Sequence, residues 1–296
     1  MRITLTGATG FLGQRLVQRL SADGHSLQLL TRKPLTGLPA QVESFLWDPP
    51  RVEAPAEALQ DSDAIIHLAG APVNQRWTEE AKRVLRSSRI DTTRSLVHSL
   101  STMARRPQVL LSASAIGFYG ERGDEILRED SSAGSGFLAS LCEDWEKQAG
   151  LARSLGMRVR CLRTGIVLGK EGGALPSLLP AFRFGLGGKL GSGEQWMSWI
   201  HIEDWITAVL HLLDPSLTTS GPVNLTTPNP VRNADFTATL GRVLHRPALL
   251  SVPVFALRLL LGEMSSVLVA SQRVLPDASL EFRYPALEPA LRALLQ

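Results

Sequence analysis

The first thirteen residues constrain the fold of this chain more than any other stretch. They read MRITLTGATGFLG, so a short apolar run leads directly into Gly7, Gly10 and Gly13. Leucine and valine recur at helical spacing in the residues that follow, up to Leu20. The pattern predicts a β-strand, a tight glycine turn and an amphipathic helix. Three spaced glycines alone are a weak signal, but between a strand and a helix they form a specific motif.

The three glycines suit a turn that holds a dinucleotide. Gly7 allows a tight turn that a Cβ atom would obstruct, Gly10 lets the backbone approach a pyrophosphate, and Gly13 lets the helix pack on the strand. The free N–H groups and the positive dipole end of the helix would face the phosphates. A tight turn without a ligand is the alternative, but the context favours binding. The expected contacts are Gly7, Thr9, Gly10, Phe11, Leu12 and Gly13.

The residues after the second predicted strand indicate which dinucleotide binds. This strand covers residues 26–31, and it is followed by Arg32 and Lys33 with no acidic residue. An NAD site usually offers Asp or Glu to the ribose 2′-hydroxyl, whereas an NADP site offers Arg to the 2′-phosphate. We therefore expect NADP(H), with Arg32 as the main contact and Lys33 as a second one. A solvated basic loop is the alternative interpretation.

Two further strands end in residues that suit a ligand. A predicted strand over 42–47 precedes Asp48, which could contact adenine or simply cap a turn. An apolar strand over 63–68 ends in small residues, and ligands of such sheets bind outside the carboxyl ends of the strands. His67 lies inside this apolar strand, so we interpret it as a core histidine with satisfied nitrogens. The expected ligand contacts at this edge are Asp48, Leu68, Ala69 and Gly70.

Later strands add hydroxyl groups at the same edge. A predicted strand over 107–112 opens into SASAIGFYG, whose hydroxyls would lie beside the reactive ring of a cofactor. Another strand over 157–163 runs into a threonine and a glycine, which we expect on the nicotinamide side. The expected contacts here are Ser112, Ser114, Thr164 and Gly165.

Strands alternate with helices up to Gly169, which predicts a Rossmann-type α/β fold, a parallel sheet wound on both faces. The character of the chain then changes. A glycine-rich stretch over 185–193 suggests irregular, mobile structure over the cleft, and helical patterns dominate toward the C-terminus. We expect a dinucleotide-binding domain over 1–230 and a smaller, mostly helical lobe on the substrate side over 231–296.

The composition excludes several other classes of protein. Hydrophobic residues make up 44% of the chain, enough for a full core, and a net charge of +3 argues only weakly for nucleic acid. The two cysteines, Cys142 and Cys161, show no metal-ligand spacing and suit a reducing compartment. We see no signal-peptide pattern and no apolar run of membrane-spanning length. We expect a cytoplasmic protein with a small-molecule substrate and with no metal, nucleic acid or membrane partner.

The motifs together resemble those of the extended short-chain dehydrogenase/reductases, which include nucleotide-sugar epimerases. The glycine turn TGATGFLG, the strand end HLAG, the serine strand that ends in YG and the segment WIHIED carry this resemblance. A narrower match is to an atypical branch called epimerase family proteins, on FLA and WE in the predicted helix over 137–155 and on LGEM, SQRV and YP near the C-terminus. The resemblance implies NADP(H) binding and an epimerase-like architecture of two lobes, and it implies no known substrate.

The chain departs from the pattern of that family at its catalytic pair. Typical members use Tyr-x-x-x-Lys, in which the Tyr exchanges a proton with the substrate and the Lys lowers the pKa of the Tyr. The tyrosines of this chain are Tyr119 and Tyr284, and the residues four positions after them are Gly123 and Glu288. Standard proton transfer by tyrosine is therefore not expected. The remaining candidates for the acid–base chemistry are Ser114, Glu143 and His201.

Two functions fit these observations. The first is an NADP(H)-dependent oxidoreductase or epimerase-like enzyme that acts on a sugar nucleotide or a small carbonyl or hydroxyl compound. The second is a nonenzymatic NADP(H)-binding regulatory or scaffold protein, which the missing Tyr and Lys favour. The predicted helices over 78–103 and 137–155 could pair in a homodimer, a question that the sequence leaves open.

Overall fold

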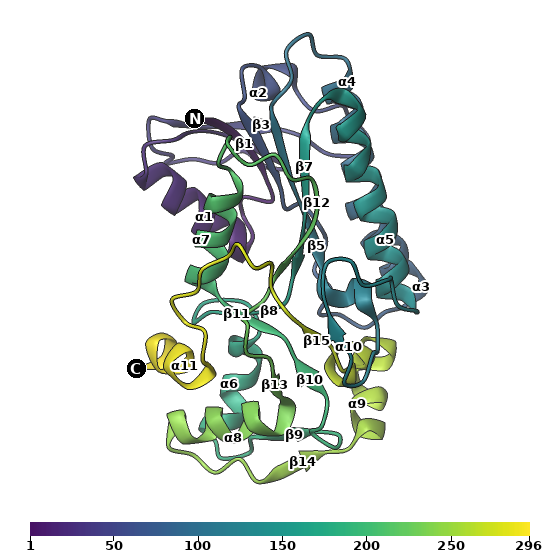
Figure 1. Ribbon diagram of the computed structural model, residues 1–296, viewed down its shortest axis with the longest axis vertical. Coiled ribbons are helices and arrows are strands. Elements are labelled where there is room, and N and C mark those ends of the chain that lie inside the picture. Colours follow the sequence, from purple (N-terminus) through teal and green to yellow (C-terminus); the bar gives the residue numbers. More distant parts are fainter.

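Seven parallel strands form the central sheet, in the order β3-β2-β1-β4-β5-β7-β12 (Figure 1). The computed structural model describes residues 1–296. The strands of the sheet are β1 (Arg2–Thr6), β2 (Ser26–Thr31), β3 (Val42–Leu46), β4 (Ala64–His67), β5 (Val109–Ala115), β7 (Arg158–Thr164) and β12 (Gly221–Leu225). All neighbouring strands run parallel, and the order reverses between β1 and β4. This topology confirms the predicted doubly wound α/β fold.

Helices cover both faces of the sheet. On one face, α1 (Phe11–Ala22) and α7 (Ile202–Leu212) pack into the larger hydrophobic core. On the other face, α4 (Thr92–Ser101), α5 (Phe137–Gly150) and the short α2 (Ala56–Leu59) form a second core. Because both faces are covered, the central strands are apolar along most of their length instead of alternating with polar residues.

The helical pattern predicted over 78–103 is interrupted in the structure. The first part, α3 (Glu79–Arg86), begins after Thr78, whose hydroxyl accepts a backbone N–H bond of 3.2 Å. A π-helical turn over Ser87–Asp91 then leads into α4. Such turns change the direction of the side chains that follow them. Within this turn, Arg89 donates to a carbonyl oxygen of the loop after β4.

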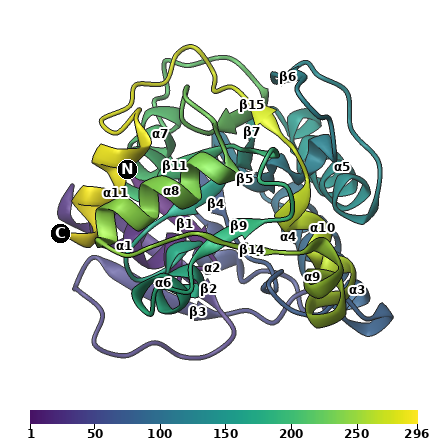
Figure 2. The ribbon, with the colours of Figure 1, turned by 90° about the horizontal axis from the view of Figure 1, so that it is seen from below.

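A smaller lobe lies at the carboxyl ends of the sheet strands (Figure 1). Short strand pairs within it and at the junction are β6 (Ile126–Leu127) with β15 (Arg273–Val274), β8 (Ile166–Leu168) with β11 (Trp199–His201), β9 (Gly188–Leu190) with β14 (Leu250–Val252), and β10 (Trp196–Met197) with β13 (Val231–Arg232). Its helices are α6 (Leu175–Arg183), α8 (Asn233–Leu244), α9 (Val254–Leu261), α10 (Ser265–Val269) and α11 (Leu287–Leu295). Figure 2 shows α9 and α10 beside α3, where Lys82 pairs with Glu263 at 2.5 Å.

The smaller lobe contains two separate parts of the chain, so a boundary at residue 230 describes it incompletely. Both α6 and β9 precede β12 in the sequence, yet α6 packs against α8 and β9 pairs with β14. The glycine-rich stretch over 185–193 therefore includes an ordered strand where the sequence predicts irregular structure. Local periodicity reports helices and strands, and it carries no information on which lobe a segment joins.

The C-terminal segment crosses back to the larger lobe. In the first turn of α7, the carboxylate of Asp204 accepts the backbone N–H groups of Arg283 at 2.8 Å and Tyr284 at 3.0 Å. The chain then ends in α11, which packs against α8. None of the helices combines the length and the apolar character that crossing a bilayer requires.

Candidate functional site

The glycine turn between β1 and α1 is tightly packed, as its sequence pattern implies. Gly7 has a φ of +74°, in the left-handed region, and a Cβ atom there would lie 2.7 Å from the carbonyl carbon of Leu68. A Cβ atom on Gly13 would overlap the carbonyl oxygen of Gly7. The fold itself therefore requires glycine at both positions.

The N-terminus of α1 is open for an anionic ligand. Gly10 precedes the first turn, no side chain caps this end of the helix, and the first turn holds no acidic residue. Thr9 and Gly10 are exposed. The first backbone N–H groups of α1 therefore have no partner in the helix and lie at the positive end of its dipole. This arrangement suits a phosphate group.

The aromatic ring of Phe11 packs against the loop that follows β8. A Cβ atom on Gly169 or Gly172 would overlap this ring. Phe11 thus holds the glycine turn against that loop. Its predicted contact with a ligand consequently depends on its backbone N–H group at the start of α1, as does that of Leu12.

Arg32 and Lys33 follow β2 and form the basic end of the site. Both side chains are exposed and have no carboxylate partner. The hydroxyl of Thr31 donates to the carbonyl oxygen of Lys33 at 2.8 Å, which holds the turn. Asp48, which we predicted near adenine, is exposed after β3 and lies 3.7 Å from Arg51. Two free cations at this point suit a ligand with an additional negative charge.

A chain of buried polar groups holds the end of β4. Thr6 Oγ1 accepts the backbone N–H groups of Leu68 and Ala69, each at 3.1 Å, and donates to His67 Nδ1 at 2.8 Å. Thr93 Oγ1 donates its proton to the backbone carbonyl of Arg89 at 2.6 Å, so it accepts from His67 Nε2 at 3.0 Å, and the imidazole proton is on Nε2. Burial lowers the pKa of His67 to about 4, so the ring is neutral at pH 7. His67 is the core histidine that the sequence predicts.

The two serines lie inside β5, which continues to Ala115 beyond its predicted end at residue 112. The hydroxyl of Ser114 donates to Glu146 Oε1 at 2.6 Å. Arg163 donates to both oxygens of the same carboxylate, from Nε at 2.8 Å and from Nη2 at 2.9 Å. Ser112 is fully buried and Ser114 is buried. The proton of the Ser114 hydroxyl is thus directed to a buried ion pair.

The same network extends to Tyr119. Arg163 Nη1 donates to the Tyr119 hydroxyl at 2.9 Å, and this hydroxyl donates to Asn224 Oδ1 at 2.7 Å. The guanidinium of Arg163 also stacks on Phe118, with 3.5 Å between Cζ and the ring centroid. Burial raises the pKa of Tyr119, so the phenol stays protonated. Sequence reasoning missed this network, and its available signal was an arginine, Arg163, within a buried strand.

Glu143 and His201 occupy positions that do not support a catalytic role. Glu143 is exposed on α5. His201 is buried, its Nδ1 accepts the backbone N–H of Glu203 at 3.1 Å, and its ring stacks on Tyr284 with centroids 4.0 Å apart. Burial lowers the pKa of His201 to about 4. His201 is therefore a neutral cap of α7, and its Nε2 has no partner in the structure.

Thr164 holds the end of β7 against α7, and Gly165 holds it against the segment between β10 and β11. Thr164 Oγ1 accepts from Trp205 Nε1 at 3.1 Å and donates to a backbone carbonyl at 3.2 Å. A Cβ atom on Gly165 would lie 2.6 Å from the carbonyl oxygen of Ser198. Both residues are partly exposed, so a contact with the nicotinamide side remains a prediction.

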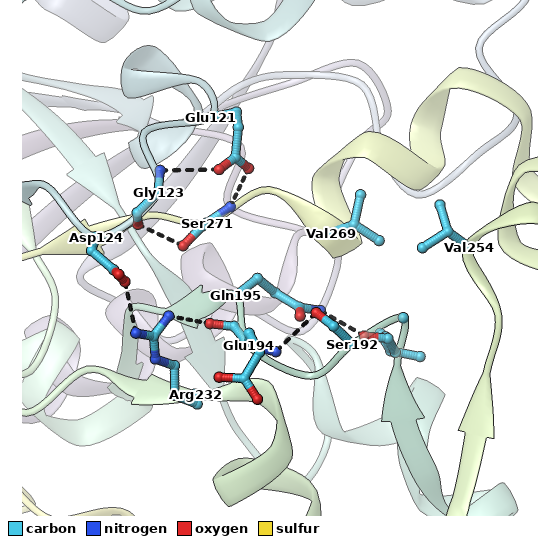
Figure 3. A pocket seen from close by; sticks show the side chains of 12 residues that line it. Glu121, Gly123, Asp124, Ser192, Glu194, Gln195, Arg232, Val254, Val269 and Ser271 are labelled. Atoms are coloured by element: carbon cyan, nitrogen blue, oxygen red, sulfur yellow. Dashed lines mark hydrogen bonds and ion pairs between the residues drawn. The ribbon is translucent and has the colours of Figure 1, made fainter.

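A pocket of about 410 Å³ lies between the loop after β5 and the smaller lobe (Figure 3). The loop contributes Glu121 and Asp124, the turn between β9 and β10 contributes Glu194, and β13 contributes Arg232. Arg232 Nη2 donates to Asp124 Oδ1 at 2.7 Å, and Trp196 Nε1 donates to the same oxygen at 2.8 Å. The pocket wall thus carries three carboxylates and one arginine, which is already paired.

Comparisons with known sequences match two separate parts of the chain to two family models. Residues 3–225 match the sequence model of the NAD dependent epimerase/dehydratase family. Residues 252–294 match a C-terminal domain described as Domain of unknown function (DUF1731). The first match covers the central sheet together with the glycine turn, and the second covers the segment from β14 to α11.

Similar proteins cover nearly the whole chain. It is 42% identical to the chloroplastic epimerase family protein SDR39U1 homolog of Arabidopsis thaliana, over 100% of this chain and 87% of the relative. It is 38% identical to epimerase family protein YfhF of Bacillus subtilis, over 100% of this chain and 98% of the relative. The crystal structure of human epimerase family protein SDR39U1 (isoform2) with NADPH matches with a TM-score of 0.87 and 30% identity, over 99% of each chain. The chain therefore belongs to the NAD-dependent epimerase/dehydratase family, as an epimerase family protein with an NAD(P)-binding Rossmann-type fold.

Proposed function

We propose that this protein is an NADP(H)-dependent oxidoreductase or epimerase-like enzyme in which Arg32 and Lys33 hold the 2′-phosphate of the cofactor. The observation that carries the proposal is this pair of exposed cations without a carboxylate partner at the end of β2. The open N-terminus of α1 lies after the neighbouring strand β1 and suits the pyrophosphate. The human relative solved with NADPH adds support.

The residues of this chain would position the cofactor, which supplies the hydride chemistry. The glycine turn lets the pyrophosphate approach the N–H groups of α1, and Arg32 places the adenine half over β2. The order of the strands reverses between β1 and β4, and dinucleotides cross a sheet at such a point. We therefore expect the nicotinamide half over the ends of β4, β5 and β7.

The charge of the pocket in Figure 3 favours a small neutral carbonyl or hydroxyl compound over a sugar nucleotide. Carboxylates of Glu121, Asp124 and Glu194 would repel a diphosphate, and Arg232 already pairs with Asp124. A volume of about 410 Å³ is within the range of small-molecule sites. The pocket borders the loop that leaves β5, beside the expected nicotinamide half.

Fluorescence titrations with NADPH and NADH test the cofactor assignment. The variants are Arg32→Ala and Arg105→Ala. Arg105 is a matched control because it is also an exposed arginine but precedes β5, at the amino ends of the parallel strands, away from the expected site. We expect the wild type to prefer NADPH, Arg32→Ala to lose most of that preference and Arg105→Ala to keep it. Equal affinity of the wild type for both dinucleotides would refute the assignment to NADP(H).

A nonenzymatic NADP(H)-binding regulatory or scaffold protein is the second candidate. It is favoured because the hydroxyl groups near the expected nicotinamide already donate their protons within the protein. Ser114 donates to Glu146, and Tyr119 donates to Asn224. NADPH consumption with a panel of small carbonyl compounds and nucleotide sugars separates the two candidates. Turnover of any compound supports the enzyme, and tight NADPH binding without turnover across the panel supports the regulator.

A further inference from the structure

The smaller lobe exposes large apolar side chains at its end away from the central sheet (Figure 1). Two segments supply them, residues 184–186 after α6 and residues 249–260 in β14 and α9. Single exposed apolar residues are common in folded proteins, but a gathering of large ones marks a surface that contacts another body. We call it the distal surface, and its apolar residues, each 62% to 90% exposed, are Phe184, Leu186, Leu249, Phe255, Leu259 and Leu260.

Backbone contacts hold the two segments of the distal surface together. β9 pairs with β14, and the carbonyl oxygen of Gly187 accepts the backbone N–H of Leu250 at 3.4 Å. Arg246 Nε donates to the carbonyl oxygen of Arg183 at 3.1 Å, so the loop before β14 lies against the end of α6. α9 follows β14 after Pro253, and Figure 2 shows both elements in the foreground of the view onto this end of the molecule.

The outward face of α9 is apolar. Phe255, Leu259 and Leu260 lie on one side of the helix and are 70% to 74% exposed. Leu257 lies on the other side and is buried against the lobe. A surface helix usually buries its apolar side and presents polar residues to water. α9 is apolar on both sides, so its outward residues are free to contact another body.

Cations without carboxylate partners accompany these apolar residues. Residues 183–190 and 242–261 contain five Arg or Lys residues and no Asp or Glu, although the whole chain has 31 basic and 28 acidic residues. Four of the five cations take part in none of the ion pairs of the structure, namely Arg183, Lys189, Arg246 and Arg258. These segments therefore attract an anionic body.

A hollow of about 700 Å³ lies beside Leu249. Its lining includes Arg242, Arg246 and Arg292. Arg242 and Arg292 share one carboxylate, that of Glu288, at 3.1 Å and 2.8 Å, so three guanidinium groups have a single acid between them. Guanidinium groups match the geometry of phosphate oxygens. A place that suits an anionic headgroup thus lies next to a protruding leucine.

The chemistry of the distal surface matches one leaflet of an anionic bilayer. Such a leaflet offers apolar chains beneath a layer of phosphates, and a peripheral protein binds it with protruding apolar side chains beside cations. A second copy of this chain fits less well. Across a two-fold axis the same surface meets itself, and the unpaired cations of both copies would then repel each other.

We propose that the distal surface docks on a membrane that contains anionic phospholipids, with Phe184 and Leu249 inserted among the headgroups and Arg246 on a phosphate. The expectation of no membrane partner rests on the lack of an apolar run of spanning length, and contact with one leaflet requires no such run. The inference goes beyond the proposed NADP(H) function and is independent of it.

Co-sedimentation of the full chain with vesicles tests the proposal. One set of vesicles contains phosphatidylcholine with phosphatidylglycerol, and the other contains phosphatidylcholine alone. We expect the wild type to bind the anionic vesicles about tenfold more tightly than the neutral ones, or more. Raising the salt from about 0.1 M to about 1 M should release the protein, because the Debye length falls from about 10 Å to about 3 Å.

Two variants separate the apolar part of the contact from the charged part. Leu249→Ser removes a protruding apolar side chain and should weaken binding to anionic vesicles about tenfold. Arg246→Glu reverses a charge and should weaken this binding about fivefold or more. Leu46→Ser and Arg105→Glu are the matched controls, because both residues are exposed in the larger lobe, and they should bind like the wild type. Thermal unfolding of each variant checks that the fold is kept.

Three results would overturn the proposal. The first is a wild type that does not bind anionic vesicles, and a dimer that Leu249→Ser dissociates would then assign the surface to a second copy. The second is equal binding to both sets of vesicles, which removes the role of the cations. The third is an equal loss in the variants and their controls. NADPH titration of Leu249→Ser and Arg246→Glu should give the wild-type affinity, so each result leaves the proposed NADP(H) function intact.

Discussion

The Ser114 hydroxyl donates a hydrogen bond of 2.6 Å to Glu146 Oε1, and Glu146 in turn holds Arg163 with both of its carboxylate oxygens. This arrangement joins β5, α5 and β7 at the edge of the sheet where the nicotinamide is expected. A serine at such an edge would be a natural proton donor to a substrate. Here its proton is donated to Glu146 inside the protein. We therefore expect the Ser114 hydroxyl to contribute to the free energy of unfolding more than to catalysis.

Ser114→Ala should lower stability and leave turnover close to that of the wild type. The substitution removes a donor from a buried carboxylate, and the loss of a hydrogen bond to a charged group costs about 1.5–3 kcal/mol. Urea unfolding measures this loss. Ser112→Ala is the control, because the Ser112 hydroxyl makes only a contact of 3.5 Å and should cost less. A large loss of turnover at unchanged stability would return Ser114 to a catalytic role.

Glu146→Ala should be far more destabilising than the removal of a surface carboxylate. Arg163 is 4% exposed, so loss of Glu146 leaves a buried charge without its partner and should cost about 3–5 kcal/mol. Glu203→Ala is the comparison, because the side chains of Arg15 and Glu203 are each 38% exposed, and it should cost less than about 1 kcal/mol. Urea unfolding measures both, and equal costs would contradict the argument from burial.

The buried His67 should make the protein less stable as the pH falls from about 6.5 toward 4. Its pKa is lowered to about 4 in the folded protein, below the ordinary value of 6.5, so only the unfolded chain takes up the proton in this window. The contribution is fully present above pH 6.5, and about 3 kcal/mol is lost by pH 4.

Nuclear magnetic resonance of the imidazoles measures this directly. We expect the His67 signals to show the neutral Nε2–H form from pH 8 down to about pH 5. The wild type should also lose more stability than His67→Gln between pH 6.5 and 4. A His67 ring that gains its proton near pH 6.5 would refute the assignment.

Gly10→Ala and Gly13→Ala should separate binding from folding. Gly10 has a φ of −79°, and a Cβ atom there would stand 3.4 Å from the carbonyl oxygen of Gly7, so alanine fits the fold. Its methyl group would stand where a phosphate approaches α1, and NADPH affinity should fall about tenfold or more. Gly13→Ala should lower the unfolding free energy by about 1–3 kcal/mol, because its Cβ atom overlaps Gly7.

Urea unfolding and NADPH titration of both glycine variants check this pair of outcomes. Wild-type binding by Gly10→Ala would show that no phosphate lies against the start of α1. Wild-type stability of Gly13→Ala would show that the helix and the strand can separate to admit the methyl group. The wild-type chain under the same conditions is the reference for both measurements.

Much of the fold follows from patterns that act over a few residues. The apolar run before Gly7, the glycine spacing and the helical periodicity after it predict β1, the turn and α1. Alternation of strands and helices predicts the parallel sheet, and Arg32 with Lys33 marks the end of β2. Element boundaries depend on tertiary contacts: β5 continues to Ala115, so Ser114 is buried within the strand and does not lie beyond its end.

The sequence by itself therefore determined the Rossmann-type sheet, the glycine turn before α1 and the basic end of β2, because glycine geometry, periodicity and charge act on near neighbours. Only the tertiary structure decided that Ser114 bonds to Glu146, which is 32 residues away, and that Glu146 pairs with Arg163, which is 17 residues away. Such facts depend on which side chains the sheet and its covering helices bring into contact, and burial then makes every pairing, or its absence, matter energetically.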